Sequence, residues 1–480
     1  MPLLAGLKSD NEINTQNTVL FADLFGITAF RYLIKNAFVV NEGITEKKSV
    51  LVENGRISKI AYHIPHREGL VVINAEGKHL LPGVIDTHVH FRDPGLTHKA
   101  DFYTESCAAV AGGVTSVIDM PNTKPQTTTE ALLDDKIAMA GKKSVVNFGF
   151  MVGATNDNID TLNSIDTAKY AAIKLFMGSS TGNMLVSDDA ALERLFQTAK
   201  KPIVAHCEDE ARIAERTAIA KERWGDNAPA SAHAFIRDDE ACFRSTQKAV
   251  ALAKRHNARL HVAHLTTAKE LSLFESGDMH DKHITAEVTS NHLWFSDEDY
   301  ATLGNRIRCN PSVKSAADRD ALRKALNDGR LDTIATDHAP HLLEEKMKPY
   351  FDSVSGMPSI QHSLPVMLEL CRQGVLTVET VVEKMCHNPA TLFAIAERGF
   401  IREGYHADLV LVDLGTETVV DKAELFYKCR WSPMEGTRLH CKVIKTFVNG
   451  VEVFDCKTGV HNDIKGMPLQ YADTHTIKMG

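Results

Sequence analysis

The sequence predicts an α/β protein: a (β/α)8 barrel of the TIM type with a small β-sandwich domain built from the N- and C-terminal segments. Two patterns predict this fold. Apolar runs alternate with amphipathic stretches across residues 81–399, and short segments with a period of two residues flank this region on both sides. The 480 residues, 44% of them hydrophobic and 24% charged, supply enough apolar material for a large core.

The sequence pattern of the flanking segments predicts short strands joined by tight turns. Asn54-Gly55 separates two such segments near the start of the chain, and another Asn-Gly pair lies within residues 441–454. Because chain termini often lie close together, we expect residues 31–80 and 400–480 to form one composite β domain, with the barrel of residues 81–399 inserted between them. Residues 1–30 are predicted to be a poorly ordered N-terminal extension.

Eight apolar runs are the predicted barrel strands. They cover residues 83–91, 113–120, 144–152, 170–178, 202–207, 258–265, 283–289 and 332–339. Residues 188–201 and 316–329 have the pattern of amphipathic helices between strands. A doubly wound open sheet is the competing fold, but it does not explain why polar residues follow so many of the runs.

Composition excludes several classes of function. The net charge of −8 gives no basic surface for nucleic acid, and no run approaches the roughly 18 apolar residues of a membrane span. Charged residues such as Lys8 and Glu12 interrupt the start of the chain where a signal peptide would be apolar. Nine scattered cysteines without a C-x-x-C pair favour a reducing compartment, so we expect a cytoplasmic protein.

Lys174 stands alone in the apolar run of residues 170–178. A buried, unpaired ammonium would cost several kcal/mol, so this amine must be neutral, paired or chemically altered. A neutral amine reacts with carbon dioxide to give a carbamate. Like a carboxylate, this group is an anion with two oxygens, and it can bridge two cations. The alternative is an ammonium that reaches the strand end and pairs with Asp337.

Four histidines and Asp337 lie near the ends of predicted strands. His88 and His90 are two residues apart, so their imidazoles project from the same face of one strand. His206, His264 and Asp337 follow other runs, and the carboxyl ends of barrel strands gather in one place. Together with a carbamate they suit two zinc ions, although histidines that only satisfy hydrogen bonds in the core are the alternative.

Other residues could act on a substrate at this site. Asp337 is placed to accept a proton from an attacking hydroxide and return it to a leaving nitrogen, unless it merely caps a helix. Arg92 offers a planar fork for a carboxylate, or a surface ion pair. Asn122 could hydrogen-bond a substrate, or serve a turn between prolines. Two zinc ions would leave a local positive charge that attracts an anionic substrate.

An ordered set of motifs resembles the dihydroorotases of the amidohydrolase superfamily, of the kind whose metals are bridged by a carbamylated lysine. The motifs are HVHFRDPG, GGVTSVIDMPNTKP, IKLFMG, IVAHCE, HVAHLTT, AEVTSNHLWF and ATDHAPH, within residues 31–455. The resemblance implies that His88, His90, Lys174, His206, His264 and Asp337 bind zinc and that Arg92, Asn122, Asn310 and His341 hold the substrate. It also points to Glu287 as a third-metal ligand, or simply a hydrogen-bonded glutamate, and to Thr181 in a loop that closes over substrate.

The resemblance implies a hydrolase that acts on cyclic amides, catalysing the reversible cyclisation of N-carbamoyl-L-aspartate to L-dihydroorotate in pyrimidine synthesis. An allantoinase or a dihydropyrimidinase/hydantoinase is the alternative, and Arg92, Asn122 and His341 argue against it because they suit a free carboxylate. An inactive scaffold homologue is an alternative of another class. We further expect a homo-oligomer, a dimer or a tetramer, with a small-molecule substrate and no nucleic-acid or membrane partner.

Overall fold

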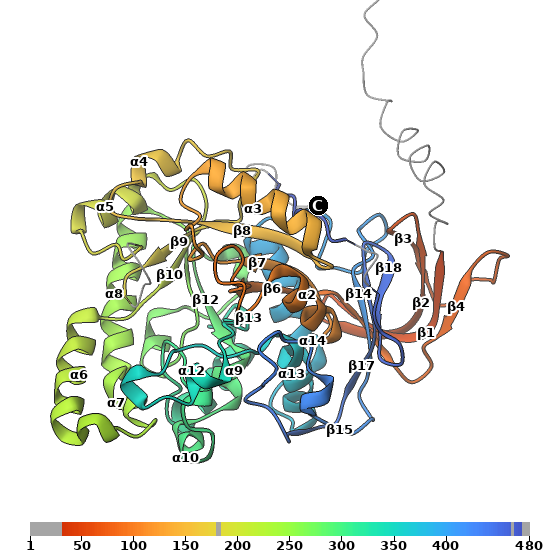
Figure 1. Ribbon diagram of the computed structural model, residues 1–480. Coiled ribbons are helices and arrows are strands. Elements are labelled where there is room, and N and C mark those ends of the chain that lie inside the picture. Colours follow the sequence, from red (N-terminus) through yellow and green to blue (C-terminus); the bar gives the residue numbers. More distant parts are fainter. Residues whose placement is uncertain (1–30, 179–183, 462–464, 473–480) are drawn as a thin grey trace, which may run out of the picture.

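The computed structural model describes residues 31–178, 184–461 and 465–472, in two regions that lie side by side (Figure 1). One region is a barrel surrounded by helices, and the other is a sheet to which both ends of the described chain contribute. The predicted extension of residues 1–30 and the loop residue Thr181 lie outside the described residues.

Eight parallel strands form the barrel, and they follow one another in chain order. The strands are β6 (Val84–Val89), β7 (Val114–Asp119), β8 (Asn147–Gly153), β9 (Ala172–Phe176), β10 (Ile203–His206), β11 (Leu260–Val262), β12 (Ile284–Thr289) and β13 (Thr333–Ala335). A parallel bridge between Val89 and His338, with the His90 N–H donating to the His338 carbonyl at 2.7 Å, joins the last strand to the first. The predicted fold class is confirmed, and β8 alone extends past its predicted run, by Gly153.

Helices surround the barrel, and capping side chains set the starts of some of them. They are α2 (Phe102–Ala111), α3 (Glu130–Lys143), α4 (Ile159–Leu162), α5 (Asp189–Thr198), α6 (Glu210–Trp224), α7 (Ala232–Ile236), α8 (Asp239–His256), α9 (Ser290–Trp294), α10 (Tyr300–Leu303), α11 (Ala316–Asn327), α12 (Leu343–Lys346), α13 (Ser363–Arg372), α14 (Val378–Val382) and α15 (Asn388–Leu392). The Asp188 side chain accepts from the Ala191 N–H at the start of α5, and Ser315 caps α11 in the same way. These two helices lie within the stretches that the sequence predicts as helical.

The second region is a mixed sheet in which the two ends of the chain are hydrogen-bonded neighbours. Its strands are β1 (Tyr32–Asn41), β2 (Ile44–Glu53), β3 (Arg56–Ala61), β4 (Val71–Asn74), β5 (His79–Pro82), β14 (Leu409–Asp413), β17 (Lys442–Val448), β18 (Val451–Asp455) and β19 (Gly459–Val460). The N-terminal strand β5 pairs with the C-terminal strand β14, antiparallel. A short hairpin of β15 (Thr418–Val419) and β16 (Arg438–Leu439) stands apart. The division into domains at residues 81 and 399 stays a prediction.

The two predicted Asn-Gly turns pack against each other. Asn54 and Gly55 have φ of +53° and +79°, and Asn449 and Gly450 have +51° and +75°, the left-handed values that tight hairpins require. A Cβ atom on Gly450 would lie 2.5 Å from the Gly55 Cα, so the backbones touch. Glycine is therefore needed at Gly450 for its conformation and for the close approach.

Asp408 links the sheet to the barrel. This buried carboxylate accepts from the Asn449 N–H at 2.7 Å and from the Asn147 Nδ2 at 3.2 Å, and it pairs with Arg398. Asn147 opens barrel strand β8, whereas Asn449 lies in the turn after β17. This carboxylate is thus a direct link between the two regions.

The last described segment, residues 465–472, lies against the barrel beside β8. Pro468 forms a parallel bridge with Phe148, and Leu469 and Tyr471 join a buried cluster inside the barrel with Met151 and other strand residues. A Cβ on Gly149 would lie 2.1 Å from the Tyr471 hydroxyl, so the contact is close. This segment covers the barrel near the start of β8. The polar residues gather at the opposite ends of the strands, their carboxyl ends.

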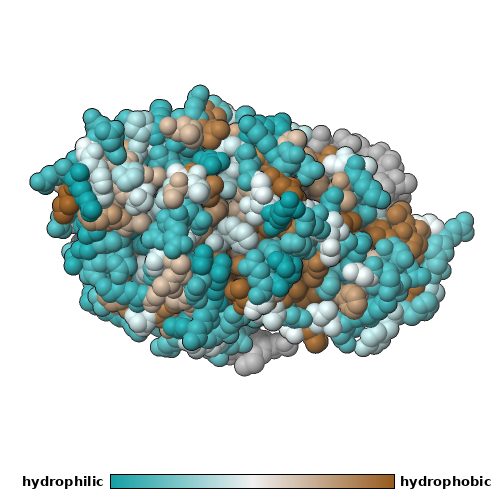
Figure 2. Space-filling view, turned by 90° about the horizontal axis from the view of Figure 1, so that it is seen from below, coloured by the Kyte–Doolittle hydropathy of each residue, from teal (hydrophilic) through white to brown (hydrophobic). Residues whose placement is uncertain are grey.

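The surface seen in Figure 2 is mostly hydrophilic, with small hydrophobic areas separated from one another. Within the part of the chain that the structure describes, no helix is both long and apolar enough to pass through a membrane. All nine cysteines lie in this part, and each is free.

We predict that Gly450→Ala destabilises the fold more than Gly43→Ala. Both glycines have positive φ, +75° and +78°, but a Cβ at Gly43 meets open space. Gly43→Ala is the control, and its free energy of unfolding should fall by about 1 kcal/mol because alanine is strained at positive φ. Gly450→Ala should lose about 1–3 kcal/mol more because its Cβ clashes with Gly55. Urea denaturation of the three proteins measures the difference, and equal losses would show that the two turns do not touch.

Candidate functional site

The structure places all six predicted metal ligands toward the carboxyl ends of the barrel strands. His88 lies within β6 and His90 follows it directly, while Lys174 lies within β9 and His206 ends β10. The other two, His264 and Asp337, come two residues after β11 and β13 respectively. A parallel barrel brings these strand ends to one rim, which is why residues far apart in the sequence can form one site.

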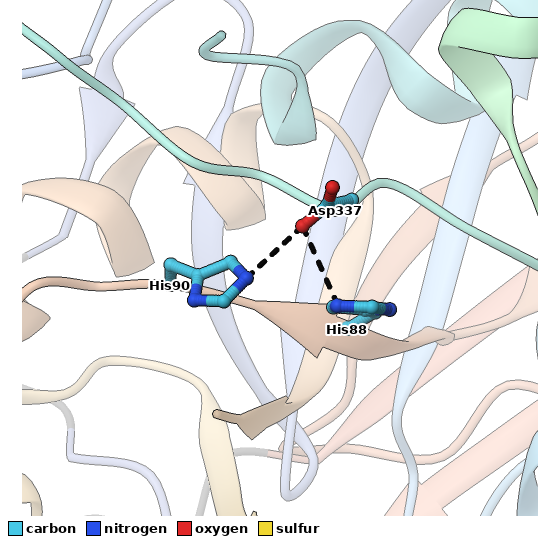
Figure 3. Close-up of side chains that lie close together, drawn as sticks. All are labelled: His88, His90 and Asp337. Carbon is cyan, nitrogen blue, oxygen red and sulfur yellow. Dashed lines mark hydrogen bonds and ion pairs between the residues drawn. The ribbon is translucent and has the colours of Figure 1, made fainter. Parts of the chain in front are cut away.

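His88, His90 and Asp337 form the centre of the site (Figure 3). The Asp337 Oδ1 lies 3.0 Å from the His90 Nε2 and 3.4 Å from the His88 Nε2. One ligand atom from each of the three residues lies within 4.8 Å of the others. Two imidazole nitrogens and one carboxylate oxygen at this spacing are a ligand set that zinc accepts.

The other two histidines continue this group. The His206 Nδ1 lies 2.8 Å from the His264 Nε2, and the ring of His264 lies 5.3 Å from that of His88. Burial lowers the pKa of His206, and it lowers the pKa of His264 well below the ordinary value. Both imidazoles are therefore neutral, as metal ligands must be.

Lys174 is fully buried, and its Nζ has no hydrogen-bond partner among the described residues. Burial lowers the pKa of this amine to about 8, against the opposing attraction of Glu287 and Asp337. Lys174 and Asp337 form no ion pair, so the alternative of a lysine that pairs with Asp337 is not what the structure has. The amine is much closer to its neutral, carbon-dioxide-reactive form than an exposed lysine would be.

Three buried polar atoms around these histidines lack hydrogen-bond partners in the described part of the chain. They are the Lys174 Nζ, the His264 Nδ1 and the Glu208 Oε1. Buried polar atoms are nearly always satisfied, so a group of unsatisfied ones indicates a site shaped around something it binds. Nitrogen and oxygen donors from four histidines and a carboxylate fit a metal site.

Carboxylate and amide oxygens orient the histidines. The His88 Nδ1 donates to the Glu287 Oε1 at 2.8 Å, and the His90 Nδ1 donates to the Asn122 Oδ1 at 2.8 Å. Because these oxygens can only accept, the proton of each ring lies on Nδ1 and the Nε2 lone pairs face Asp337.

Glu287 is held on every side. Its Oε1 also accepts from the His264 N–H at 3.1 Å, and the Thr87 hydroxyl lies 3.4 Å from its Oε2. Burial raises the pKa of Glu287, but the charge and hydrogen bond of His88 outweigh burial, and the pKa is lowered overall. Of the two expectations for Glu287, these contacts favour the hydrogen-bonded glutamate over a third-metal ligand.

Asp337 is ionised and strained. Burial raises the pKa of its carboxyl, but His88 and His90 lower it more strongly, and the result lies below the ordinary value. Asp337, Arg92 and His264 have φ of +49°, +64° and +39°, a region that costs a residue with a side chain about 1–3 kcal/mol. Such strain at three neighbouring positions is typical of a functional site.

The predicted substrate residues form a second group of contacts. The Arg92 Nη2 lies 3.0 Å from the His341 Nε2, and the Arg92 Nε donates to the Pro340 carbonyl at 3.1 Å. Asn310 instead contacts the buried His233, whose Nε2 lies 3.1 Å from the Asn310 Oδ1. Asn122, as described above, contacts His90 rather than this group.

Sequence reasoning missed two side chains that contact the predicted site residues. The Lys99 Nζ lies 2.9 Å from the His341 Nδ1, and Glu208 pairs with His206 at 2.9 Å and with Arg237. Lys99 follows Arg92 by seven residues in one loop, so a second cation in that loop was the available signal. Glu208 follows His206 by two residues, the spacing that places both on one face of an extended chain.

A barrel that gathers histidines and an aspartate at one rim is typical of metal-dependent barrel enzymes. Residues 79–453 match the model of the Amidohydrolase family, well over half of the chain. The chain belongs to this family.

Relatives and solved structures agree with that assignment. A dihydroorotase of Methanosarcina acetivorans is 34% identical over 414 residues, 84% of this chain and 88% of that protein. A dihydroorotase of Halobacterium salinarum is 36% identical and covers 82% of this chain and 90% of its own length. The structure of the L-hydantoinase (dihydropyrimidinase) from Arthrobacter aurescens, 27% identical, matches 92% of this chain and 100% of its own with a TM-score of 0.86.

We predict that Asn122 controls metal affinity through His90. Asn122→Ala removes the oxygen that orients the His90 ring and should weaken zinc binding about 10- to 100-fold. Asn122→Asp keeps an acceptor in the same place and is the matched control, with affinity retained. Competition with a chromophoric chelator measures both, and equal affinities in the two variants would contradict this role.

Proposed function

We propose that this protein catalyses the reversible cyclisation of N-carbamoyl-L-aspartate to L-dihydroorotate, as a hydrolase of cyclic amides. The observation that carries the proposal is the pair of Arg92 and His341 beside the group of His88, His90 and Asp337. Arg92 and His341 can bind a carboxylate. The group of His88, His90 and Asp337 can bind a metal that assists attack on an amide. Relatives that are named dihydroorotase and are more than 30% identical support the same activity.

The proposed cofactor is a pair of zinc ions per subunit. His88 and His90 would hold one ion, His206 and His264 the other, and Asp337 would lie near the first. Lys174 would bridge them after its neutral amine adds to carbon dioxide, which forms an N–C bond and releases a proton. When bound, the ions supply Lewis acidity toward the amide carbonyl and lower the pKa of water.

Asp337 is the proposed acid/base. Its carboxylate accepts the proton of the water that attacks the ring carbonyl of dihydroorotate, and it then delivers this proton to the ring nitrogen as the C–N bond breaks. The lowered pKa keeps the Asp337 carboxyl ionised, which is the form that can accept a proton. In the reverse direction Asp337 removes the proton from the ureido nitrogen as that nitrogen closes the ring.

The substrate contacts are proposed at Arg92, Asn122, Asn310 and His341. Arg92 is buried, and its Nε donates to the Pro340 carbonyl. This hydrogen bond orients the guanidinium so that its Nη2 points toward His341. Buried charge attracts a carboxylate more strongly than surface charge does, because water screens it less. The Oδ1 atoms of Asn122 and Asn310 contact His90 and His233 respectively. The side-chain N–H groups of both residues are therefore the donors proposed to bind the substrate.

A hydantoinase or dihydropyrimidinase activity is the second candidate, and an allantoinase belongs with it. The observation that favours it is the close fold of the Arthrobacter aurescens enzyme, with a TM-score of 0.86. Those substrates are cyclic amides, and the Arg92 and His341 donors would have no carboxylate to bind in hydantoin. An inactive scaffold is disfavoured because every predicted ligand is present.

We place the enzyme in pyrimidine synthesis in the cytoplasm, since nine free cysteines suit a reducing compartment. We also propose a homo-oligomer, a dimer or a tetramer, with no nucleic-acid or membrane partner. Light scattering of the purified protein coupled to size exclusion decides the oligomeric state.

The deciding experiment is an assay of the zinc-loaded protein on dihydroorotate, hydantoin and allantoin side by side. We expect turnover of dihydroorotate to exceed the others, because its carboxylate can bind Arg92. Arg92→Met should lower kcat/KM for dihydroorotate about 100-fold or more while the zinc content stays unchanged. Preference for hydantoin in the wild type, or an unaffected Arg92→Met, would reject the proposed substrate.

Lys174→Ala tests the bridging role. We expect this variant to lose bound zinc and nearly all activity, since the carbamate would supply one oxygen to each ion. Short carboxylic acids such as acetate, added at high concentration, should restore part of the zinc content by occupying the space of the missing side chain. Zinc analysis and turnover are the measurements, and normal zinc with normal turnover would reject the carbamate.

A further inference from the structure

Glu105 and His338 form a buried pair that the proposed mechanism does not use. Both side chains are fully buried, and the Glu105 Oε2 lies 2.8 Å from the His338 Nε2. Glu105 belongs to helix α2, whereas His338 directly follows Asp337 in the chain. The pair therefore joins a surrounding helix to the residue next to the proposed acid/base.

The hydrogen bonds of His338 fix the position of its ring proton. Its Nδ1 accepts from the Ser359 N–H at 3.0 Å and, more weakly, from the Ile360 N–H at 3.4 Å. Because a backbone N–H only donates, Nδ1 carries a lone pair and the ring proton is on Nε2, where it faces Glu105. The protein occupies both ring nitrogens, so neither is free to bind a metal.

The backbone of His338 carries this restraint to the site. Its carbonyl accepts from the His90 N–H at 2.7 Å, and its own N–H donates to the Thr336 hydroxyl at 2.9 Å. Asp337 lies between Thr336 and His338 and has φ of +49°, a strained value that persists only where the surrounding structure holds it. A movement of His338 would therefore displace both Asp337 and His90.

Glu105 is itself held through its second oxygen. The Oε1 accepts from the Lys428 N–H at 3.1 Å and from the Thr104 hydroxyl at 3.0 Å. An ionised carboxylate accepts at both oxygens, so the Oε2 stays available to the His338 ring. Glu105 is thus fixed on α2 in the place where the His338 Nε2–H needs an acceptor.

We propose that Glu105 is a positioning residue that acts through the His338 ring to hold Asp337 and the His90 backbone in place. Without this acceptor the buried Nε2–H would lose its partner, an unfavourable state that the ring can leave only by moving. The backbone on either side would then move with the ring. The effect on proton transfer by Asp337 rests on the proposed function.

The test compares Glu105→Leu with Glu105→Gln. Leucine removes the acceptor, so kcat for dihydroorotate should fall about 10- to 100-fold while KM changes less than about threefold, because Asp337 moves a proton and does not hold the bound substrate. Zinc affinity, measured by competition with a chromophoric chelator, should fall about 10-fold or more. Glutamine keeps an oxygen for the Nε2–H and should restore most of both quantities.

Glu369→Leu is the matched control. Glu369 is also a buried glutamate on a helix, α13, and its Oε2 lies 3.2 Å from the His440 Nδ1 and accepts from the His440 N–H at 2.9 Å. This pair lies outside the proposed site, so the control should lose thermal stability while kcat, KM and zinc affinity stay at wild-type values. A Glu105→Leu variant that behaves like this control overturns the positioning role.

A measurement on the wild-type protein covers the case in which Glu105→Leu does not fold. Nitrogen-15 NMR of the histidine-labelled, zinc-loaded protein distinguishes Nδ1–H from Nε2–H rings, and the signal lost in His338→Gln identifies this ring among the 22 histidines. We expect Nε2–H. An Nδ1–H ring would not donate to Glu105 and overturns the proposal.

These outcomes separate the two proposals. A wild type that ignores dihydroorotate defeats the proposed function, while the zinc affinities of the two Glu105 variants still decide the positioning role. A wild type that turns over dihydroorotate, together with unchanged kcat and zinc affinity in Glu105→Leu, defeats the positioning role alone.

Discussion

Burial of the Lys174 amine is the constraint on which the proposed site depends. A barrel strand whose other residues are apolar places this amine where water cannot reach it, and no described side chain accepts a hydrogen bond from it. Its pKa of about 8 means that the neutral amine is available at physiological pH. In the proposed site, carbon dioxide adds to this neutral amine, and the negatively charged product helps to hold the cations.

The proposed ligands around Lys174 can hold a metal only if their lone pairs converge, and residues outside this group orient them. Glu287 and Asn122 fix the protons of His88 and His90 on the outward nitrogens. These contacts join barrel strands that are remote in the sequence, and the close pairing of neighbouring strands makes them rigid. The site is therefore preorganised by the barrel itself, and the strained backbones at Arg92 and Asp337 are tolerated because the surrounding strands hold them.

Much of the fold could be predicted because local patterns specify it. Each apolar run of the barrel contains a strand, and the Asn-Gly pairs form the expected turns. The positions of Lys174 within a buried strand and of the four histidines at strand ends were also predictable, because both are local anomalies; their role as metal ligands stays a prediction.

What could not be predicted depends on pairs of side chains from different loops. Nothing in the sequence indicates that Asn122 turns toward His90, or that Lys99 meets His341 across 242 residues of chain. The packing of residues 465–472 against the barrel likewise lacks a local signal, since this segment is short and has no strand pattern of its own. Hydrogen-bond partners depend on tertiary placement, which periodicity does not carry.

The barrel does not select the substrate, because a hydantoinase shares nearly the same fold at 27% identity. Substrate selection must therefore arise from the side chains at the rim of the barrel. The charged side chains of this protein indicate which part of the rim is involved. The protein carries a net charge of −8, yet Arg92 and Lys99 are both buried beside His341. Burying two cations in an acidic protein costs free energy, and a single carboxylate, Glu345, lies on one of them. Arg92 forms no ion pair among the described residues, although Asp337 and Asp119 stabilise its charge from further away. A substrate carboxylate can supply the direct partner that Arg92 lacks, and this is a reason for the protein to prefer a carboxylate-bearing substrate.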